Sequence, residues 1–170
     1  RLGARRIVEL AEARGATTLL AAYDEIVART FARATEAAGR IPAGTYRFTD
    51  VMDDDGKGAH DMPIQVAVTA GDAAAQGRVA FDFTGTSPQQ GSNFNAPEPV
   101  TRAAVLYVFR VMVDDDIPMN AGCLRPIHII IPENSMLAPH YPAAVVAGNV
   151  EVSQAVTDTL FGALGTMAGA

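Results

Sequence analysis

The stretch "VAFDFTGTSPQQGSNFNAP", residues 79 to 97, changes character halfway along. Its first part alternates as a β-strand does, and one face carries the apolar residues Val79, Phe81 and Phe83. The other face carries Asp82 and Thr84, which are expected to meet solvent, a partner layer or a site. The second part is a loop of small polar residues. Such a loop suits close approach to an anion or an amide-like ligand, and it equally suits a turn whose side chains bond their own backbone.

Two earlier segments show the same alternation. Residues 46–52 and 63–69 are predicted strands, and "IPAGTY", residues 41 to 46, is the turn that leads into the first of them. Together with residues 79–84 they predict an antiparallel meander of three strands.

Residues 2–39 are predicted to be helical in two pieces, with a break at Gly15 and an end at Gly39. Apolar side chains recur there at helical spacing: Leu20, Tyr23, Val27, Phe31 and Ala34. We expect these residues to form a packing helical hairpin.

After the polar loop, Thr101 is expected to cap a helix that runs through Met112 and ends at the acidic "DDDIP" turn, residues 114 to 118. "RPIHIIIP", residues 125 to 132, is a predicted strand, and its run of isoleucines indicates burial on both faces.

A last helix is predicted after Asn149, which is expected to cap it. Its apolar stripe is Val152, Val156, Leu160 and Ala163. The fold class is therefore α+β, with a mixed or antiparallel sheet and packing helices. Residues 1–170 are expected to be a single domain or an internal fragment of a longer chain, with a helical hairpin over 1–40 and a mixed α+β part over 41–170. The fragment interpretation arises because the sequence opens on Arg1 rather than Met.

Composition excludes several classes of function. The chain has 170 residues, 49% of them hydrophobic, and a net charge of −6. Its basic residues are scattered, which argues against a nucleic acid or an anionic membrane as partner. No apolar run approaches the ~20 residues that span a bilayer. The single cysteine, Cys123, cannot form an internal disulfide, so we expect a reducing compartment, the cytoplasm.

An acidic segment, residues 50 to 62, has a pattern similar to a calcium loop. Asp53, Asp55 and Gly56 match three positions of an EF-hand, but the two positions for anchoring carboxylates hold Val51 and Met62. A hairpin turn with solvated carboxylates is favoured.

Other candidate sites are weak. His60, His128 and His140 have no short spacing to one another, so structural roles are favoured over a metal site assembled by folding. Cys123 is favoured as a small buried side chain rather than a nucleophile. Ser87 fails the G-x-S-x-G pattern because proline follows it.

Three motifs in order carry a resemblance. They are "FDFTGTSPQQGSNFNAP" (81–97), "DIPMNAGCLRPIHIIIPENSML" (116–137) and "YPAAVVAGNVEVSQAVTDTLFGALG" (141–165). With "IPAGTYRFTDVMDDDG" (41–56), the series resembles the central part of the hydantoinase B/oxoprolinase family. That family comprises subunits or domains of ATP-dependent hydantoinases, 5-oxoprolinases and acetone or acetophenone carboxylases.

The resemblance implies ATP-dependent hydrolysis of a cyclic amide: N-methylhydantoin, hydantoin or 5-oxoproline. Phosphorylation of the amide carbonyl oxygen would make a poor electrophile reactive. In the family, ATP is bound mainly by a partner, the hydantoinase A-type subunit. "DFTGT" is similar to the phosphate motif of actin-like ATPases, yet it lacks a second glycine beside Gly85, and no P-loop lysine is present. A divalent metal in the parent protein would take its ligands from outside this fragment.

The resemblance also implies site residues. The candidate catalytic residues are Asp82, Asn120, Arg125 and Glu151, with Asp82 or Glu151 as general base. The candidate substrate-binding residues are Gly85, Thr86, Gln90, Asn95, Asn149 and Gln154, whose amides suit a lactam. Each has a structural alternative, such as pairing of Arg125 with Asp116 or Glu133.

Two other functions stay open at this point. The chain could belong to a ketone carboxylase, or its motif loops could be a non-catalytic surface that grips the ATPase partner.

Overall fold

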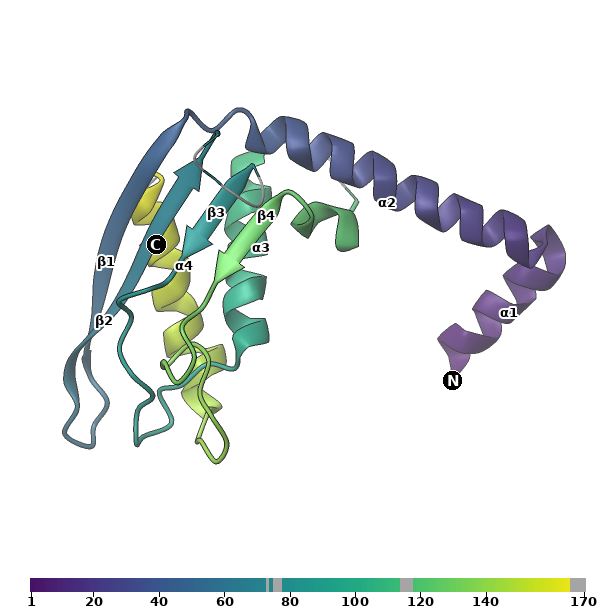
Figure 1. Ribbon diagram of the computed structural model, residues 1–170. Coiled ribbons are helices and arrows are strands. Elements are labelled where there is room, and N and C mark those ends of the chain that lie inside the picture. Colours follow the sequence, from purple (N-terminus) through teal and green to yellow (C-terminus); the bar gives the residue numbers. More distant parts are fainter. Residues whose placement is uncertain (73, 75–77, 114–117, 166–170) are drawn as a thin grey trace.

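The computed structural model describes residues 1–72, 74, 78–113 and 118–165. They form a four-stranded sheet with two helices packed on one face and a helical arm that projects from one end (Figure 1). The strands are β1 (Gly44–Asp54), β2 (His60–Ala70), β3 (Val79–Asp82) and β4 (Ile127–Ile130). The α-helices are α1 (Leu2–Arg14), α2 (Ala16–Ala38), α3 (Glu98–Val113) and α4 (Glu151–Ala163), and the 3₁₀ helices are η1 (Ala121–Leu124) and η2 (Val146–Asn149).

The sheet confirms the predicted meander and the α+β class. Strands β1, β2 and β3 pair antiparallel in sequence order, and β4 then pairs parallel to β3, which makes the sheet mixed. Along β2 buried residues alternate with half-buried ones, and Ile64, Val66 and Val68 face the core. Helices α3 and α4 cover that face, where Phe81 and Phe83 are also fully buried.

The other face of the sheet is open, and this corrects the prediction for residues 125–132. Strand β4 lies at the sheet edge, so only its Ile127 and Ile129 pack against the core. Ile130 remains 39% exposed. A run of isoleucines fits burial on two faces, but an edge strand with one uncovered face cannot provide it.

Two predicted helix caps are wrong. Helix α3 begins at Glu98, so Thr101 lies inside the helix and is fully buried. Pro99 fits this early start because a first-turn residue needs no intrahelical N–H partner. Helix α4 is preceded by Val150 without a side-chain cap, and Asn149 belongs to η2 instead. Its predicted stripe of four apolar residues is buried. Residues 114–117 of the acidic turn lie outside the described residues.

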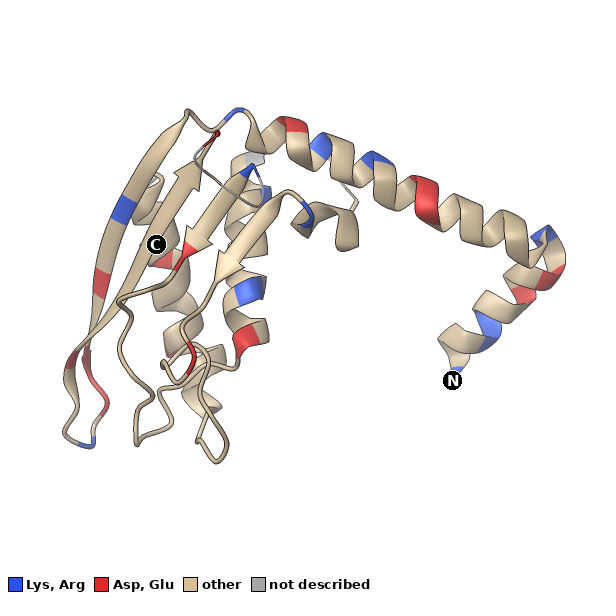
Figure 2. Cartoon of the chain, viewed as in Figure 1, with Lys and Arg blue, Asp and Glu red and all other residues tan. Residues whose placement is uncertain are grey.

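The N-terminal helix pair is present, but it packs differently from a compact hairpin. Ala34 is buried against the body, whereas Leu20, Tyr23 and Phe31 of the predicted stripe are exposed. Figure 2 shows that charges of both signs lie along this arm. Pairs such as Arg29 with Glu25, at 2.6 Å, are exposed i,i+4 contacts that stabilise a helix only slightly.

Candidate functional site at the end of the parallel strands

Strand β3 ends in a turn held by Asp82. Its Oδ1 accepts hydrogen bonds from Thr84 N at 2.9 Å and from Thr84 Oγ1 at 2.6 Å. Asp82 is half-buried on the open face of the sheet, as its alternation with Phe81 and Phe83 predicts. The carboxylate therefore shapes the exit of the strand, where the small polar loop begins.

The next residues are tied to β2. Gly85 has φ +100°, and a Cβ there would collide with the side-chain amide of Gln65. Thr86 Oγ1 accepts from Gln65 N at 3.1 Å and lies 3.3 Å from Gln65 O, to which it donates. Ser87 N donates to Pro63 O at 2.8 Å. Gly85 and Thr86, two predicted substrate-binding residues, thus hold the loop against the neighbouring strand.

Asn95 organises the rest of the loop from its interior. Its side chain is 0% exposed. Oδ1 accepts from Gln90 N at 2.8 Å, while Nδ2 donates to the backbone oxygens of Gln90, Ser92 and Ala144 at 2.9–3.0 Å. Gln90 itself donates from Nε2 to Pro88 O at 2.6 Å. The side-chain amide of Asn95 therefore forms its hydrogen bonds within the chain.

The loop interlocks with the segment after β4, and together residues 83–97 and 131–149 form what we term the loop cluster. Ala96 N donates to Met136 O at 2.7 Å, and Met136 N donates to Ser87 O at 3.0 Å. His140 N donates to Gln89 Oε1 at 2.6 Å. Because β3 and β4 are parallel, both loops leave the sheet at the same end, beyond the carboxyl ends of the strands. This is where α/β proteins commonly bind ligands.

A surface pocket of about 800 Å³ opens in the loop cluster. It is lined by Pro97, Glu98, Glu133, Asn134, Ala138, Pro139, His140, Tyr141, Ala143 and Val145. Glu98 is paired with Arg102 at 2.6 Å. In the described part of the chain, the side chains of Glu133, Asn134 and His140 make no hydrogen bond. The pocket therefore offers a carboxylate, an amide and an imidazole to a ligand.

Asn120 and Arg125 lie at the other end of the strand pair. Asn120 caps η1, since its Oδ1 accepts from Gly122 N at 2.8 Å, and its Nδ2 donates to Thr30 Oγ1 of α2 at 2.8 Å. Arg125 is exposed and makes no ion pair with a described residue, Glu133 included. Asp116, its other suggested partner, lies outside the described residues.

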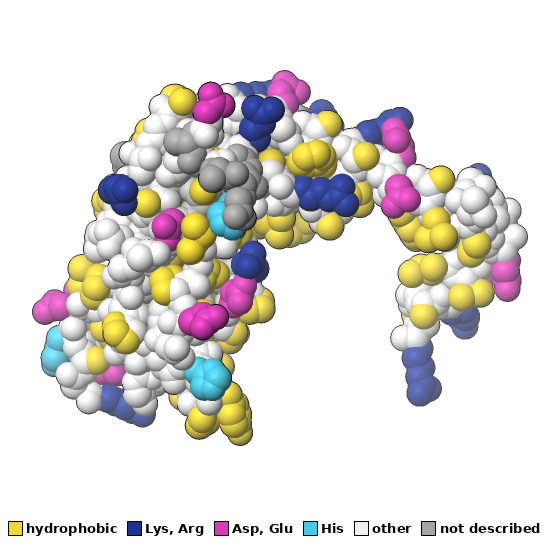
Figure 3. Space-filling view, viewed as in Figure 1, with side chains coloured by type: hydrophobic (Ala, Val, Ile, Leu, Met, Phe, Trp, Pro, Cys, Tyr) yellow, Lys and Arg dark blue, Asp and Glu magenta, His cyan; other side chains and the backbone are white. Residues whose placement is uncertain are grey.

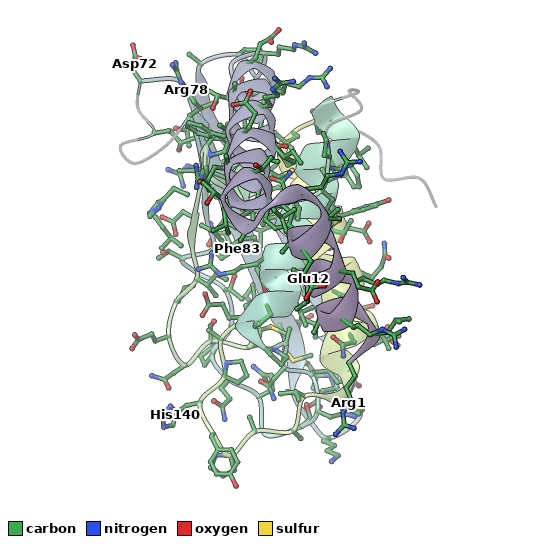
Figure 4. All side chains as sticks on the ribbon, turned by 90° about the vertical axis from the view of Figure 1, so that its right-hand side faces the viewer. Arg1, Glu12, Asp72, Arg78, Phe83 and His140 are labelled. Carbon is green, nitrogen blue, oxygen red and sulfur yellow. The ribbon has the colours of Figure 1, made fainter. Side chains whose placement is uncertain are left out.

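The length of β4, about 13 Å for four residues, separates Arg125 from the loop cluster. Arg78 N donates to Pro126 O, so Arg78 marks the Arg125 end of the sheet. Figure 4 shows Arg78 at one end of the molecule and His140 at the opposite end. The structure thus does not bring Asn120 and Arg125 to the same place as the loop cluster.

The remaining predicted residues gather at the start of α4. Asn149 and Gln154 line a separate groove of about 420 Å³ between α3 and α4. Gln154 Nε2 donates to Asp158 Oδ1 at 3.0 Å, and Glu151 is exposed in the first turn. Gly148, just before them, packs so closely that a Cβ would collide with the Asn95 carbonyl oxygen.

The β1–β2 hairpin turn also reaches the loop cluster. Asp55 accepts hydrogen bonds from Lys57 N at 2.8 Å and Ala59 N at 3.0 Å. A hydrogen bond from the Ser92 side chain, followed by the backbone bond from Lys57, lowers the pKa of Asp55 below its ordinary value. The acidic segment thus forms the turn of an antiparallel hairpin, as predicted.

The side-chain groupings and backbone hydrogen bonds also bear on whether a metal ion or a nucleotide phosphate has a site. Within the described ranges, no three His, Cys, Asp or Glu side chains gather as metal ligands, and Cys123 is buried. At the "DFTGT" turn, Thr84 N donates to Asp82 Oδ1, Thr86 N donates to Phe83 O, and Ser87 N just after the motif donates to Pro63 O. These three amides are therefore engaged within the chain. No helix in the described part of the chain is long and apolar enough to cross a membrane.

Sequence reasoning did not identify the pocket residues Glu133, Asn134 and Tyr141. The only signal was the pair of prolines at 139 and 142, which flank His140 and Tyr141 and indicate a constrained loop. Gln65 was missed because it lies mid-strand, 21 residues before Thr86.

A model of the hydantoinase B/oxoprolinase family matches residues 1–170. The chain belongs to this family. Over 87 residues, 51% of its length, it is 56% identical to 5-oxoprolinase 1 of Arabidopsis thaliana, of which the match covers 7%. It is 31% identical to the B-type subunit of a putative D-/L-hydantoinase of Pseudomonas sp. (strain NS671), with 96% of this chain and 29% of that protein covered.

A solved structure shares the fold. The ATP-dependent caprolactamase from Pseudomonas jessenii superposes with a TM-score of 0.75 at 20% identity, covering 95% of this chain and 28% of that one. The family member described here therefore spans less than a third of each of these relatives.

Proposed function

We propose that this chain is part of the B component of an ATP-dependent cyclic amide hydrolase, which acts on N-methylhydantoin, hydantoin or 5-oxoproline. The observation that carries the proposal is the family match over all 170 residues, supported by relatives named as a 5-oxoprolinase and as the B-type component of a hydantoinase. In this reaction water adds to the ring carbonyl carbon, the carbon–nitrogen bond breaks, and the nitrogen gains a proton.

We assign ATP to a partner, an A-type subunit. The turn after β3 supports this assignment, because the amides of Thr84, Thr86 and Ser87 are bonded within the chain and do not face a phosphate. The relative named as the B-type component of a hydantoinase supports a two-component enzyme.

The pocket of the loop cluster is our candidate for the amide substrate. Asn134 can pair with a ring amide through its own donor and acceptor, and His140 or Glu133 can accept a proton from water. The earlier base candidates, Asp82 and Glu151, are not among the residues that line the pocket. We propose a supporting role for Asp82, Gly85, Thr86, Gln90 and Asn95, which hold in place the loops that line the pocket.

The first experiment is substrate-dependent ADP release by the full-length parent polypeptide co-purified with its A-type partner. The panel is 5-oxoproline, hydantoins, and acetone with bicarbonate. Release that rises with one cyclic amide, together with its ring-opened product, is the expected result. Release only with ketone and bicarbonate would identify a carboxylase component instead.

A specific observation favours a second candidate, a non-catalytic assembly region. The side chains of Thr86, Asn95 and Asn120 form hydrogen bonds within the chain, as expected of residues that stabilise the fold rather than bind substrate. Arg125→Ala tests the assembly role, because Arg125 is exposed, makes no ion pair with a described residue and lies at the end of β4 away from the pocket. An assembly role predicts dissociation of the partner in this variant, whereas the pocket proposal predicts that the complex and its turnover persist. His140→Ala in the same complex tests the pocket.

A further inference from the structure

Helix α2 carries one apolar stripe along its whole length, and only part of it is covered. The C-terminal third, from Thr30 to Ala38, packs on the body next to η1. Further out, Leu20 is 63% exposed and Ile26 is 48% exposed. A helix of 23 residues is about 34 Å long, so most of this apolar stripe projects into solvent.

Helix α1 is amphipathic in the same way. Ile7, Val8 and Leu10 are exposed apolar residues on one side, while Arg5 and Glu9 form an ion pair on the other, at 3.4 Å. Figure 3 shows hydrophobic side chains along the inner, concave side of the arm, on both α1 and α2. The apolar faces of the two helices thus border one concave space.

The body extends this apolar surface. A pocket of about 330 Å³ beside η1 is lined by Leu106, Tyr107, Val111 and Met119 along with Ala103 and Arg110. Met119 is 73% exposed. Arg110 Nη1 contacts Cys123 Sγ of η1, which joins this pocket to the base of the arm. We term the exposed apolar side chains of α1, α2 and this pocket the arm surface.

The arm surface needs a cover on physical grounds. An isolated helix as short as α1 is marginal in water, and most helix stability in proteins comes from packing of the apolar face. A contiguous exposed apolar surface also marks an interaction site. The two helices have ion pairs on one side and uncovered apolar residues on the other. They are therefore suited to packing against a third structural element on the apolar side.

The solved relative indicates where that element comes from. The match to the caprolactamase leaves only about 5% of this chain outside, roughly nine residues, whereas α1 and α2 hold 13 and 23. Most of the arm is therefore part of the shared fold. There it belongs to a chain of which 72% lies outside the match, ample polypeptide to cover the arm.

We propose that the arm surface is an internal interface, which receives a helical segment of the same polypeptide from outside residues 1–170. Such a segment would present apolar residues at helical spacing, with charges on its outer side. The inference rests on family membership and on the uncovered stripe, and it does not depend on the reaction proposed above.

The test is thiol labelling of the full-length parent polypeptide. Tyr23→Cys places a thiol on the arm surface, and Ala32→Cys places a matched thiol on the exposed opposite side of the same helix, because nine residues at about 100° each end on the opposite face. The parent without an added cysteine sets the background. We expect the thiol at 23 to react at least ten-fold more slowly than the thiol at 32 in the isolated monomer. Leu20→Cys serves as the second arm-surface position if Tyr23→Cys does not fold.

Three results would overturn the proposal. Equal labelling rates at positions 23 and 32 would mean that the arm surface is open in the parent. Protection that grows with protein concentration would mean that a second copy covers it. Protection that appears only after the A-type subunit is added would make the arm surface an inter-subunit interface.

Discussion

Asn95 and Asn120 lie at opposite ends of the β3–β4 pair, and their amides have different surroundings. Asn95 is fully buried and bonds four backbone groups of the loop cluster. Asn120 is half-buried and makes two bonds, one within η1 and one to α2. The first holds loops together below a candidate pocket, and the second anchors an arm. The asparagine side chains of two family motifs thus have different structural roles at two ends of the sheet.

The largest effect is expected at Asn95. Asn95→Ala removes the partner of one buried and three partly buried backbone bonds, at about 1–3 kcal/mol for a group left unsatisfied in the interior. We expect the free energy of unfolding to fall by about 3 kcal/mol or more, measured by urea denaturation of the chain. Asn149→Ala, at an exposed position, should change it by less than about 0.5 kcal/mol. A loss below about 1 kcal/mol at Asn95 would contradict the role given to its amide.

Close packing of the third motif on the first is tested at Gly148. A Cβ there would lie 2.7 Å from Ala96 Cα, which is backbone and cannot swing away. Gly148→Ala should destabilise the chain by about 1–3 kcal/mol, the usual range for overpacking. Gly91→Ala is the matched control, since a Cβ at Gly91 meets no atom within 4 Å. Equal effects of both substitutions would refute the interlocked packing.

A smaller effect is expected at Asn120. Asn120→Ala removes the cap of η1 and the bond to Thr30, at about 1–2 kcal/mol. Hydrogen exchange should accelerate over the last third of α2, while the loop cluster keeps its protection. Asn120→Asp should retain most of the stability at neutral pH, because a carboxylate can accept from both Gly122 N and the Thr30 hydroxyl. Faster exchange in the loop cluster would show that the two ends are coupled.

The smallest effect concerns Asp55, whose pKa is lowered first by the Ser92 hydrogen bond. A lowered pKa in the folded state means that the folded chain prefers the charged form more than the unfolded chain does. This contribution is present above the unfolded value near 4 and is lost as the pH falls through the folded pKa.

NMR titration of the Asp55 carboxyl checks this prediction. In Ser92→Ala, the Asp55 pKa should rise toward its ordinary value, and the loss of stability in acid should be shallower. An unchanged titration would mean that the hairpin turn is not bound to the loop cluster.

Local patterns predicted much of the fold. The alternation of β2 and of residues 79–84 predicted the meander, and helical spacing predicted the stripe of α4. Apart from the two helix caps, the predictions that failed concern what covers a residue: the isoleucines of β4 lie on an edge strand, and Leu20 and Tyr23 lie on an uncovered arm. Periodicity states which residues share a face, but it does not state what covers that face.

The candidate site was predictable only in part. Asp82 was placed correctly on the face opposite Phe81 and Phe83, because strand alternation is a local property. The structure does not bring all the candidate site residues together, because β4 separates Asn120 and Arg125 from the loop cluster. Whether the predicted residues act in catalysis stays a prediction.

The sequence by itself determined the order of strands and helices, the amphipathic faces and the family. These depend on neighbours within a few residues and on the order of the motifs. Only the tertiary structure decided that Asn95 bonds Ala144, 49 residues away, that Asn120 holds α2, and that a pocket forms beside Glu133 and His140. Such contacts depend on the path of the whole chain, because the two parallel strands β3 and β4 bring distant loops to the same end of the sheet.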